Sequence, residues 1–337
     1  MSSARSRMED VAARAGVSVA TVSRALRDSP LVSDATKQKV LAAAEELDFA
    51  VFRAASALAS GRVGRIAVLI SGPVRAWFNG AVLDGLYDGL RAAEHELSVY
   101  RVTSLADREA FFGTLPVRRN ADALVVTSFA LTTDERDRLS SIGMPLVYVN
   151  QQVEGLPSVS IDDAAATRLG IRYLVNLGHR WPAFAQVDAR IGFTYSALGR
   201  LDGYRAELAG LGATASDVRV LRARGADDGE SVVAQLLGLA DRPSAVMAES
   251  DELALSIMAA WTRLGLRIPD DLCVLGFDDQ TLAETFGLST VAQPVTELGR
   301  RAAAMALQLA AGEEPAQREV LLPVRLVLRR TTAALRR

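Results

Sequence analysis

Residues 18–24 carry side chains whose types and spacing suit contacts with double-stranded DNA. The segment reads Ser-Val-Ala-Thr-Val-Ser-Arg. On a helix of 3.6 residues per turn, Val22 turns toward a preceding helix, whereas Ala20 and Arg24 face outward. The Arg24 guanidinium offers two parallel donors that match the major-groove acceptors of guanine. Short hydroxyl groups suited to phosphate oxygens are supplied by Ser18, Thr21 and Ser23.

Helices must position these side chains. The sequence predicts three of them, over residues 8–15, 18–26 and 33–47, with a break at Gly16. Ser18 and Ser33 are suitable N-caps for the second and third helices. Two helices joined by a tight turn can place the second helix in the DNA major groove. Residues 51–62 form a small-residue stretch that could be a short, marginal helix ended by Gly61.

From residue 65 onward, short apolar segments alternate with amphipathic helical ones. This alternation predicts parallel sheets with helices on both faces, and the number of units favours two similar sheet domains. Ligands of such folds bind at the carboxyl ends of the strands. The expected strands are Ile66–Ser71, Ser98–Thr103, Ala123–Thr127, Leu146–Asn150, Ala183–Val187, Val218–Ala223, Ala245–Ala248 and Leu272–Phe277. The expected helices include Phe78–Glu94, Asp163–Leu177, Leu201–Leu211 and Glu252–Leu264.

Composition sets broad limits on the class of protein. The chain has 337 residues, of which 50% are hydrophobic and 23% charged, so a disordered chain is excluded. No apolar run approaches the roughly 20 residues of a membrane span, and charges near the start argue against a secretory signal. Cys273 is the one cysteine, so no intrachain disulfide can form, as is typical of a reducing cytoplasm. We therefore expect a cytoplasmic protein with no membrane partner.

Neither the net charge nor a catalytic motif indicates a function for this chain. The net charge is −2, and a slight basic excess before residue 64 permits DNA binding without arguing for it. The chain has two histidines, His95 and His179, and no Cys/His cluster has metal-ligand spacing. A glycine-rich phosphate loop and a nucleophile elbow are also missing. We expect no enzymatic activity, no cofactor and no metal.

Several motifs together resemble the lactose-repressor (LacI/GalR) family of bacterial regulators. They extend over nearly the whole chain, in the order Asp10-Val11-Ala12, Ala15 to Arg24, Val32-Ser33, Leu58-Ala59-Ser60-Gly61-Arg62, Leu177-Gly178-His179-Arg180, Gly276-Phe277-Asp278-Asp279 and Leu322-Pro323 with Arg329. The resemblance implies an N-terminal all-α helix-turn-helix DNA-binding domain. It also implies an α/β core of two Rossmann-like subdomains, of the periplasmic-binding-protein-like type I, with a cleft between them. The expected regions are the helix-turn-helix domain (1–50), a hinge helix or linker (51–62), an N-terminal core subdomain (63–162 and 291–322) and a C-terminal one (163–290 and 323–337).

By this resemblance, Val19, Ala20 and Arg24 read base edges. Leu58 occupies the position of a hinge-helix leucine that wedges into the minor groove, where an apolar side chain can kink the duplex. Packing roles for Val19 and Leu58 stay open as alternatives. The chain departs from the family at residues 50–52, Ala-Val-Phe in place of Arg-Pro-Asn, and at residues 27–28, Arg-Asp in place of Asn-Gly.

The resemblance also suggests which residues line an effector pocket. The flat faces of Trp77 and Phe78 would stack on a sugar ring or a base. Arg200 would grip hydroxyl pairs or a carboxylate through its planar fork. Asp278 would accept from hydroxyls or an amine. The other candidates are Asn150, Thr127, Ser196, Ser250 and Gln293.

Ordinary structural roles remain possible for several of these residues, namely core packing for Trp77 and Phe78, a turn cap for Asp278 and a surface position for Arg200. Ala226 stands where many relatives place an aromatic wall, and Ser250 where many have asparagine.

Together these observations predict a ligand-responsive transcriptional regulator, most often a repressor in this family. It would bind a pseudo-palindromic operator as a homodimer, with a sugar or nucleobase-like effector in the cleft. The absence of trailing leucine heptads favours a dimer over a tetramer. The alternatives are a solute-binding protein of a transport system, an α/β enzyme, and a constitutive DNA binder without an effector.

Overall fold

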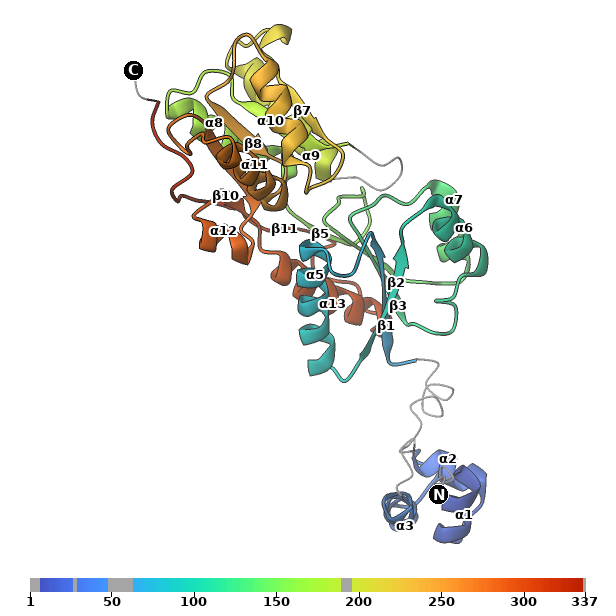
Figure 1. The fold of residues 1–337 in the computed structure, drawn as a ribbon. Coiled ribbons are helices and arrows are strands. Elements are labelled where there is room, and N and C mark those ends of the chain that lie inside the picture. Colours follow the sequence, from blue (N-terminus) through green and yellow to red (C-terminus); the bar gives the residue numbers. More distant parts are fainter. Residues whose placement is uncertain (1–6, 27–28, 48–62, 189–195, 336–337) are drawn as a thin grey trace.

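The computed structural model describes residues 7–26, 29–47, 63–188 and 196–335 (Figure 1). The predictions for Leu58 and for residues 27–28 and 50–52 lie outside the described residues. The first helices are α1 (Met8–Ala15), α2 (Val19–Ala25) and α3 (Asp34–Glu46). Gly16 ends α1 in the left-handed conformation, at φ 68°, which glycine adopts without steric cost.

Side-chain caps and a small core hold the three helices together. The Ser18 hydroxyl accepts from the Thr21 N–H at 3.1 Å, and Ser33 caps α3 in the same way. Each cap satisfies a backbone donor that the first helical turn leaves unpaired. Val11, Val22 and Val40, one from each helix, are fully buried against one another.

The first sheet is six-stranded and wholly parallel, in the order β11-β5-β4-β3-β1-β2. Its strands are β1 (Arg65–Ser71), β2 (Glu96–Val102), β3 (Ala123–Thr127), β4 (Leu146–Val149), β5 (Ser158–Ser160) and β11 (Glu319–Leu321). One face packs on α5 (Trp77–Ala92) and α13 (Val295–Ala311), the other on α6 (Leu105–Thr114) and α7 (Thr133–Ser141).

Glycines let α5 and α13 approach closely. A Cβ atom on Gly85 of α5 would lie 2.0 Å from the carbonyl oxygen of Thr296. A Cβ on Gly299 of α13 would lie 2.4 Å from the carbonyl oxygen of Val82. Both distances are far shorter than van der Waals contact, so neither position accepts a side chain without moving the helices apart.

The second sheet has the order β12-β10-β9-β8-β6-β7 and is parallel except for β12. Its strands are β6 (Ala183–Val187), β7 (Val220–Ala223), β8 (Ala245–Ala248), β9 (Cys273–Asp278), β10 (Ser289–Ala292) and β12 (Arg325–Val327). One face packs on α8 (Asp163–Asn176) and α9 (Ser196–Gly210), the other on α10 (Gly229–Gly238) and α11 (Asp251–Arg263). Two short helices, a 3-10 turn (Ala215–Asp217) and α12 (Thr281–Phe286), lie in the connections.

Within the described residues, the chain crosses between the sheets after β5, after β10 and between β11 and β12. Each sheet with its helices therefore forms a lobe, and three segments join the N-terminal and C-terminal lobes (Figure 1). This confirms the predicted fold class. The boundaries assigned to the four regions stay a prediction, and residues 291 and 292 pair within the second sheet. Among the described helices, none is long and apolar enough to span a bilayer.

Candidate DNA-binding surface and effector cleft

Helix α2 presents one buried and one exposed face. Val22 and Ala25 are buried in the three-helix core. On the opposite face Ala20 and Arg24 are exposed, as the helical period predicts. Val19 is 40% exposed, which favours a surface role over packing. The structure thus brings the described candidates for DNA contact onto one short helix.

The hydroxyl groups at the start of α2 already have partners. Ser18 caps the helix, and its Oγ lies 2.8 Å from the Thr21 Oγ1. Ser18 is exposed, whereas Thr21 and Ser23 are half-buried. A hydroxyl that accepts from a backbone N–H can still donate to a phosphate oxygen, so the cap does not prevent the predicted contact.

A cleft of about 460 Å³ lies between the two lobes. Its walls come from residues that follow the carboxyl ends of the strands, where open α/β sheets bind ligands. Eight of the nine predicted effector residues line this cleft: Trp77, Phe78, Asn150, Ser196, Arg200, Ser250, Asp278 and Gln293. Thr127 does not line it. Thr127 is fully buried as the last residue of β3, and the next residue, Ser128, lines the cleft instead, at a φ of 60° just beyond the strand.

The aromatic pair has both a packing and a lining role. Trp77 and Phe78 begin α5, are half-buried and pack against the core of the N-terminal lobe while they line the cleft. Asn79, which the sequence did not single out, fixes the preceding loop because its Nδ2 donates to the carbonyls of Ser71 at 2.9 Å and Pro73 at 3.0 Å. The loop therefore holds the aromatic side chains at the cleft.

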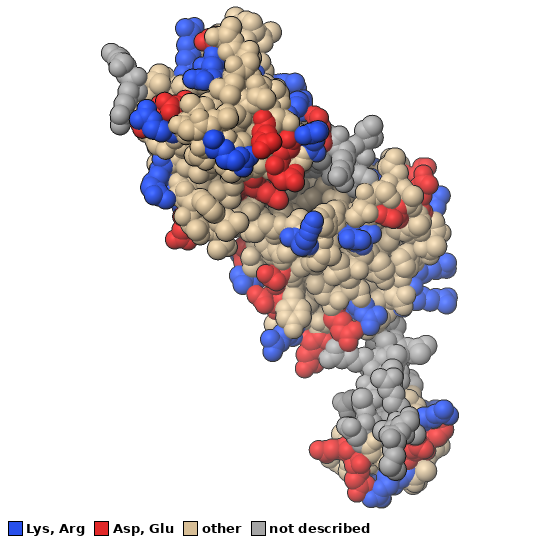
Figure 2. All heavy atoms as spheres, in the orientation of Figure 1, with Lys and Arg blue, Asp and Glu red and all other residues tan. Residues whose placement is uncertain are grey.

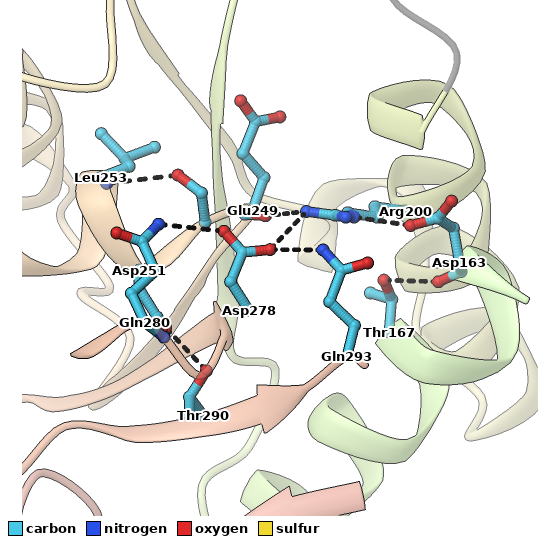
Figure 3. A network of polar contacts seen from close by, with 11 residues as sticks. Asp163, Thr167, Arg200, Glu249, Asp251, Leu253, Asp278, Gln280, Thr290 and Gln293 are labelled. Atoms are coloured by element: carbon cyan, nitrogen blue, oxygen red, sulfur yellow. Dashed lines mark hydrogen bonds and ion pairs between the residues drawn. The ribbon is translucent and has the colours of Figure 1, made fainter. Parts of the chain in front are cut away.

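Arg200 lies at the centre of a buried network on the C-terminal lobe (Figure 3). Its Nε donates to the Asp163 carboxylate at 2.8 Å, and its Nη1 donates to the Glu249 carbonyl oxygen. The Asp278 carboxylate lies 3.8 Å from Nη1, and the guanidinium lies over the Phe277 ring, 3.7 Å from its centroid. The side chain is 8% exposed, so a surface role is excluded. Its Nε and Nη1 contact protein groups, and the residue also lines the cleft, so its predicted contact with a ligand stays a prediction.

Asp278 is held in place by two amides as well as by Arg200. The Gln293 Nε2 donates to one carboxylate oxygen at 2.7 Å, and the Gln280 Nε2 donates to the other at 3.2 Å. Burial raises the pKa of Asp278 to about 6, and the Arg200 charge opposes this shift. The carboxylate therefore faces the cleft with its position already fixed.

Two acidic residues near the end of β8 were not predicted: Glu249, directly after the strand, lines the cleft, whereas Asp251, the first residue of α11, is fully buried and does not line it. The Glu249 Oε1 accepts from the Val187 N–H at 3.0 Å, and burial raises the pKa of this carboxyl to about 7. Asp251 accepts from the Thr290 hydroxyl at 2.6 Å and from the Gln280 N–H at 2.8 Å, and burial raises its pKa to about 7. Their place at the carboxyl end of a strand was a signal that could have indicated them.

Ser250 and Ser196 have local structural roles. The Ser250 hydroxyl caps α11 by accepting from the Leu253 N–H at 3.3 Å, and Ser196 is the first residue of α9. The predicted helix at 201–211 therefore begins five residues earlier, which brings Ser196 and Arg200 to the cleft. Within the described part of the chain, no group of three or more His, Cys, Asp or Glu residues could hold a metal ion.

Comparison with known proteins assigns the family. Residues 7–50 match the model of bacterial regulatory proteins of the lacI family, and residues 171–332 match a periplasmic binding protein-like domain. The transcriptional regulator GalS of Salmonella typhimurium is 33% identical, over 90% of this chain and 90% of its own length. The chain belongs to the lacI family.

A second relative and two solved structures match nearly the whole length of this chain. The transcriptional regulator DegA of Bacillus subtilis is 28% identical over 97% of this chain and 98% of its own length. The lac repressor dimer bound to operator and the anti-inducer ONPF superposes with a TM-score of 0.82 at 26% identity, covering 98% of this chain and 100% of that one. A complex of the regulator CelR with cellobiose has a TM-score of 0.70 at 26% identity, covering 97% and 100%.

These matches confirm a DNA-binding transcriptional regulator with an effector-binding core. Regulators of this family are not enzymes. The match over residues 7–50 also excludes the alternative of a solute-binding transport protein, which would share only the core fold.

Proposed function

We propose that the protein is a cytoplasmic repressor that binds a pseudo-palindromic operator as a homodimer and responds to a small polar effector in the cleft. The exposed face of α2, with Arg24 at its centre, carries the proposal because the residues behind it seat the helix on α1 and α3. The lac repressor structure is of a dimer on its operator. A dimer with a two-fold axis meets two equivalent half-sites, so its operator has matching symmetry.

For DNA contact we propose Val19, Ala20 and Arg24 toward base edges and the hydroxyls of Ser18, Thr21 and Ser23 toward phosphates. Leu58 would act in the hinge. The proposal includes the division into a helix-turn-helix domain, a hinge and two core subdomains. Ligand binding in the cleft can change DNA binding only through the segment that joins the core to the helix-turn-helix domain. An effector that favours one arrangement of the lobes would then shift the spacing of the paired hinges.

For the effector we propose a sugar or nucleobase-like molecule. The solved relatives include complexes with cellobiose and with ribose. Trp77 and Phe78 offer flat apolar faces at the cleft, and Asp278, Asn150 and Gln293 offer polar groups that surround it. Flat rings bearing hydroxyl or amine groups match this combination.

Selection from a random duplex library with the purified full chain tests the proposal. The enriched sequences should show dyad symmetry, and binding should weaken steeply with salt as phosphate contacts release counterions. Arg24→Ala should cost about 1–3 kcal/mol of specific affinity and relax one base position in each half-site. Arg14→Ala is the matched control, because this arginine lies on α1, pairs with Glu46 and is 54% exposed. Equal loss in both variants, or enrichment without symmetry, would contradict the proposal.

A further inference from the structure

The described residues around the cleft leave buried oxygen atoms without a hydrogen-bond partner. They are the Ser128 Oγ, the Asn150 Oδ1, the Glu249 Oε2 and the Gln293 Oε1. Two buried groups that can only donate also lack a partner, the indole nitrogens of Trp181 and Trp261. Neither of these residues lines the cleft. Because a buried polar atom without a partner is costly, the amide and carboxylate oxygens among them call for hydrogen-bond donors on the ligand, whereas the Ser128 hydroxyl can donate or accept.

Neighbouring contacts fix the Gln293 Oε1 as an acceptor, and they make the Glu249 Oε2 an acceptor whenever that carboxyl is ionised. The Gln293 amide donates through Nε2 to the Asp278 carboxylate, so its Oε1 cannot be exchanged for the NH₂ group. The Glu249 Oε1 already accepts from the Val187 N–H, which leaves Oε2 as the second acceptor of that carboxyl. A ligand therefore meets acceptors whose direction the surrounding protein has already set.

The charged side chains that line the cleft also favour a ligand that donates hydrogen bonds over one that carries negative charge. Its described lining includes four carboxyl groups, from Asp188, Glu249, Glu252 and Asp278, and two guanidinium groups, from Arg200 and Arg224. Arg200 pairs with Asp163 and lies 3.8 Å from Asp278, and Arg224 pairs with Asp228 at 2.9 Å. Acidic side chains gather on the C-terminal lobe beside the hollow between the lobes (Figure 2). Both cations of the described lining are thus engaged by carboxylates, and a phosphate or carboxylate on the ligand would meet an excess of negative charge among the described residues.

We propose that the effector is a cationic, donor-rich molecule of sugar size, an amino sugar in chemical class, and that its ammonium group contacts Glu249. This inference rests on the proposed function, because it assumes that the cleft binds the effector. Hydroxyl groups of the same molecule donate to the Asn150 and Gln293 oxygens, and its ring lies on Trp77 and Phe78. Phosphorylated sugars and sugar acids are excluded by the same charges.

The ionisation of Glu249 should change when the effector binds, which gives a measurement independent of the affinity. Burial raises the pKa of this carboxyl to about 7, with Arg200 and Arg222 lowering it and Asp278 raising it. An ammonium group beside the carboxyl favours its charged form. Binding at pH 7 should therefore release a fraction of a proton, which calorimetry in buffers of different ionisation enthalpy measures.

A matched ligand series tests the class on the full chain. Glucosamine, galactosamine and mannosamine are compared with the three parent sugars, their N-acetyl derivatives, their 6-phosphates and their uronic acids by thermal shift and calorimetry. We expect an amine to raise the melting temperature and to bind at least tenfold more tightly than its parent and acetylated forms, with no shift from the acids or phosphates. Stronger binding of a neutral or anionic member, or no binding by any amine, would overturn the inference.

A pair of variants tests the contact. Glu249→Gln keeps the acceptor for the Val187 N–H but removes the charge, so it should weaken amine binding at least tenfold and abolish the proton release. Glu230→Gln is the control, because Glu230 is exposed on α10 of the same lobe and does not line the cleft. Equal affinities in the two variants would refute the contact. Operator selection with the same preparations distinguishes this inference from the proposed function. If a neutral or anionic sugar released a symmetric operator, the amino-sugar inference would be refuted and the regulatory function would remain.

Discussion

Replacing Arg200 with alanine should destabilise the C-terminal lobe. The substitution removes the ion pair with Asp163, the hydrogen bond to the Glu249 carbonyl and the contact with Asp278. Asp163 is 9% exposed at its side chain, and burial raises its pKa while the Arg200 charge lowers it. Without the guanidinium, this carboxylate has no nearby positive charge to compensate for its burial.

The magnitude follows from the two ways in which the protein can respond. Breaking a buried ion pair by removal of one partner costs about 3–5 kcal/mol. The orphaned Asp163 can instead take up a proton, which from the ordinary pKa of 3.8 costs about 4 kcal/mol at pH 7. Protonation therefore limits the loss from this carboxyl to about 4 kcal/mol at pH 7, and to about 2 kcal/mol at pH 5.5.

Urea unfolding of the full chain, followed by far-UV circular dichroism, measures this loss at both pH values. Arg301→Ala is the control, because its pair with Glu297, at 2.7 Å, is as short as the pair of Arg200 with Asp163, at 2.8 Å, but the arginine is 60% exposed. Such helical surface pairs contribute about 0.5 kcal/mol or less. A loss in Arg200→Ala no larger than that of the control, or one that does not shrink toward pH 5.5, would refute the reasoning.

Two further predictions concern stability. Gly85→Ala should lower the urea midpoint markedly more than the substitution of the half-buried Gly80 by alanine, because a Cβ at Gly85 meets the α13 backbone and one at Gly80 meets no atom within 4 Å. Equal effects would contradict the close packing of α5 and α13. Lowering the pH from 8 to 5.5 should raise the free energy of unfolding, because burial raises the pKa of Glu249 and Asp251 to about 7 and that of Asp278 to about 6. Above about pH 4 these three carboxyl groups hold more protons in the folded chain than in the unfolded chain, so the free energy of unfolding falls as the pH rises through 7. A urea midpoint that stays constant or rises with pH would contradict this prediction.

The locally encoded parts of the fold were predictable. Gly16, Ser18 and Ser33 mark helix ends through backbone freedom and side-chain caps, and the three helices appear within a residue or two of their expected bounds. The strands β1, β3, β4, β6, β8 and β9 were identified because they are apolar runs, almost all of whose residues are buried. The strands β5, β11 and β12 were not, because three residues carry no distinct period, and β10 was not, because it begins with the polar pair Ser289 and Thr290.

The cleft was predictable to the level of strand ends. Residues at the carboxyl ends of parallel strands share one edge of the sheet, which is why Asn150 and Asp278 line the cleft as expected. Thr127 and Ser128 show the limit of this reasoning: the strand ends at Thr127 as predicted, but Thr127 is fully buried and the residue after it lines the cleft. The role of Glu249 depends on burial, which the sequence does not display.

The sequence by itself determined the three helices of the head and the alternation of strands and helices, because caps, periodicity and turn residues act over a few neighbours. The positions around the cleft came from the resemblance of its motifs to the family. Only the tertiary structure decided that Arg200 is neutralised by Asp163 and Asp278 and that acceptors remain unpaired around it. Those partners come from α8 and β9, far apart along the chain. Their meeting with Arg200 depends on how α8 and α9 pack on the second sheet, and the energy of each charge depends on the burial that results.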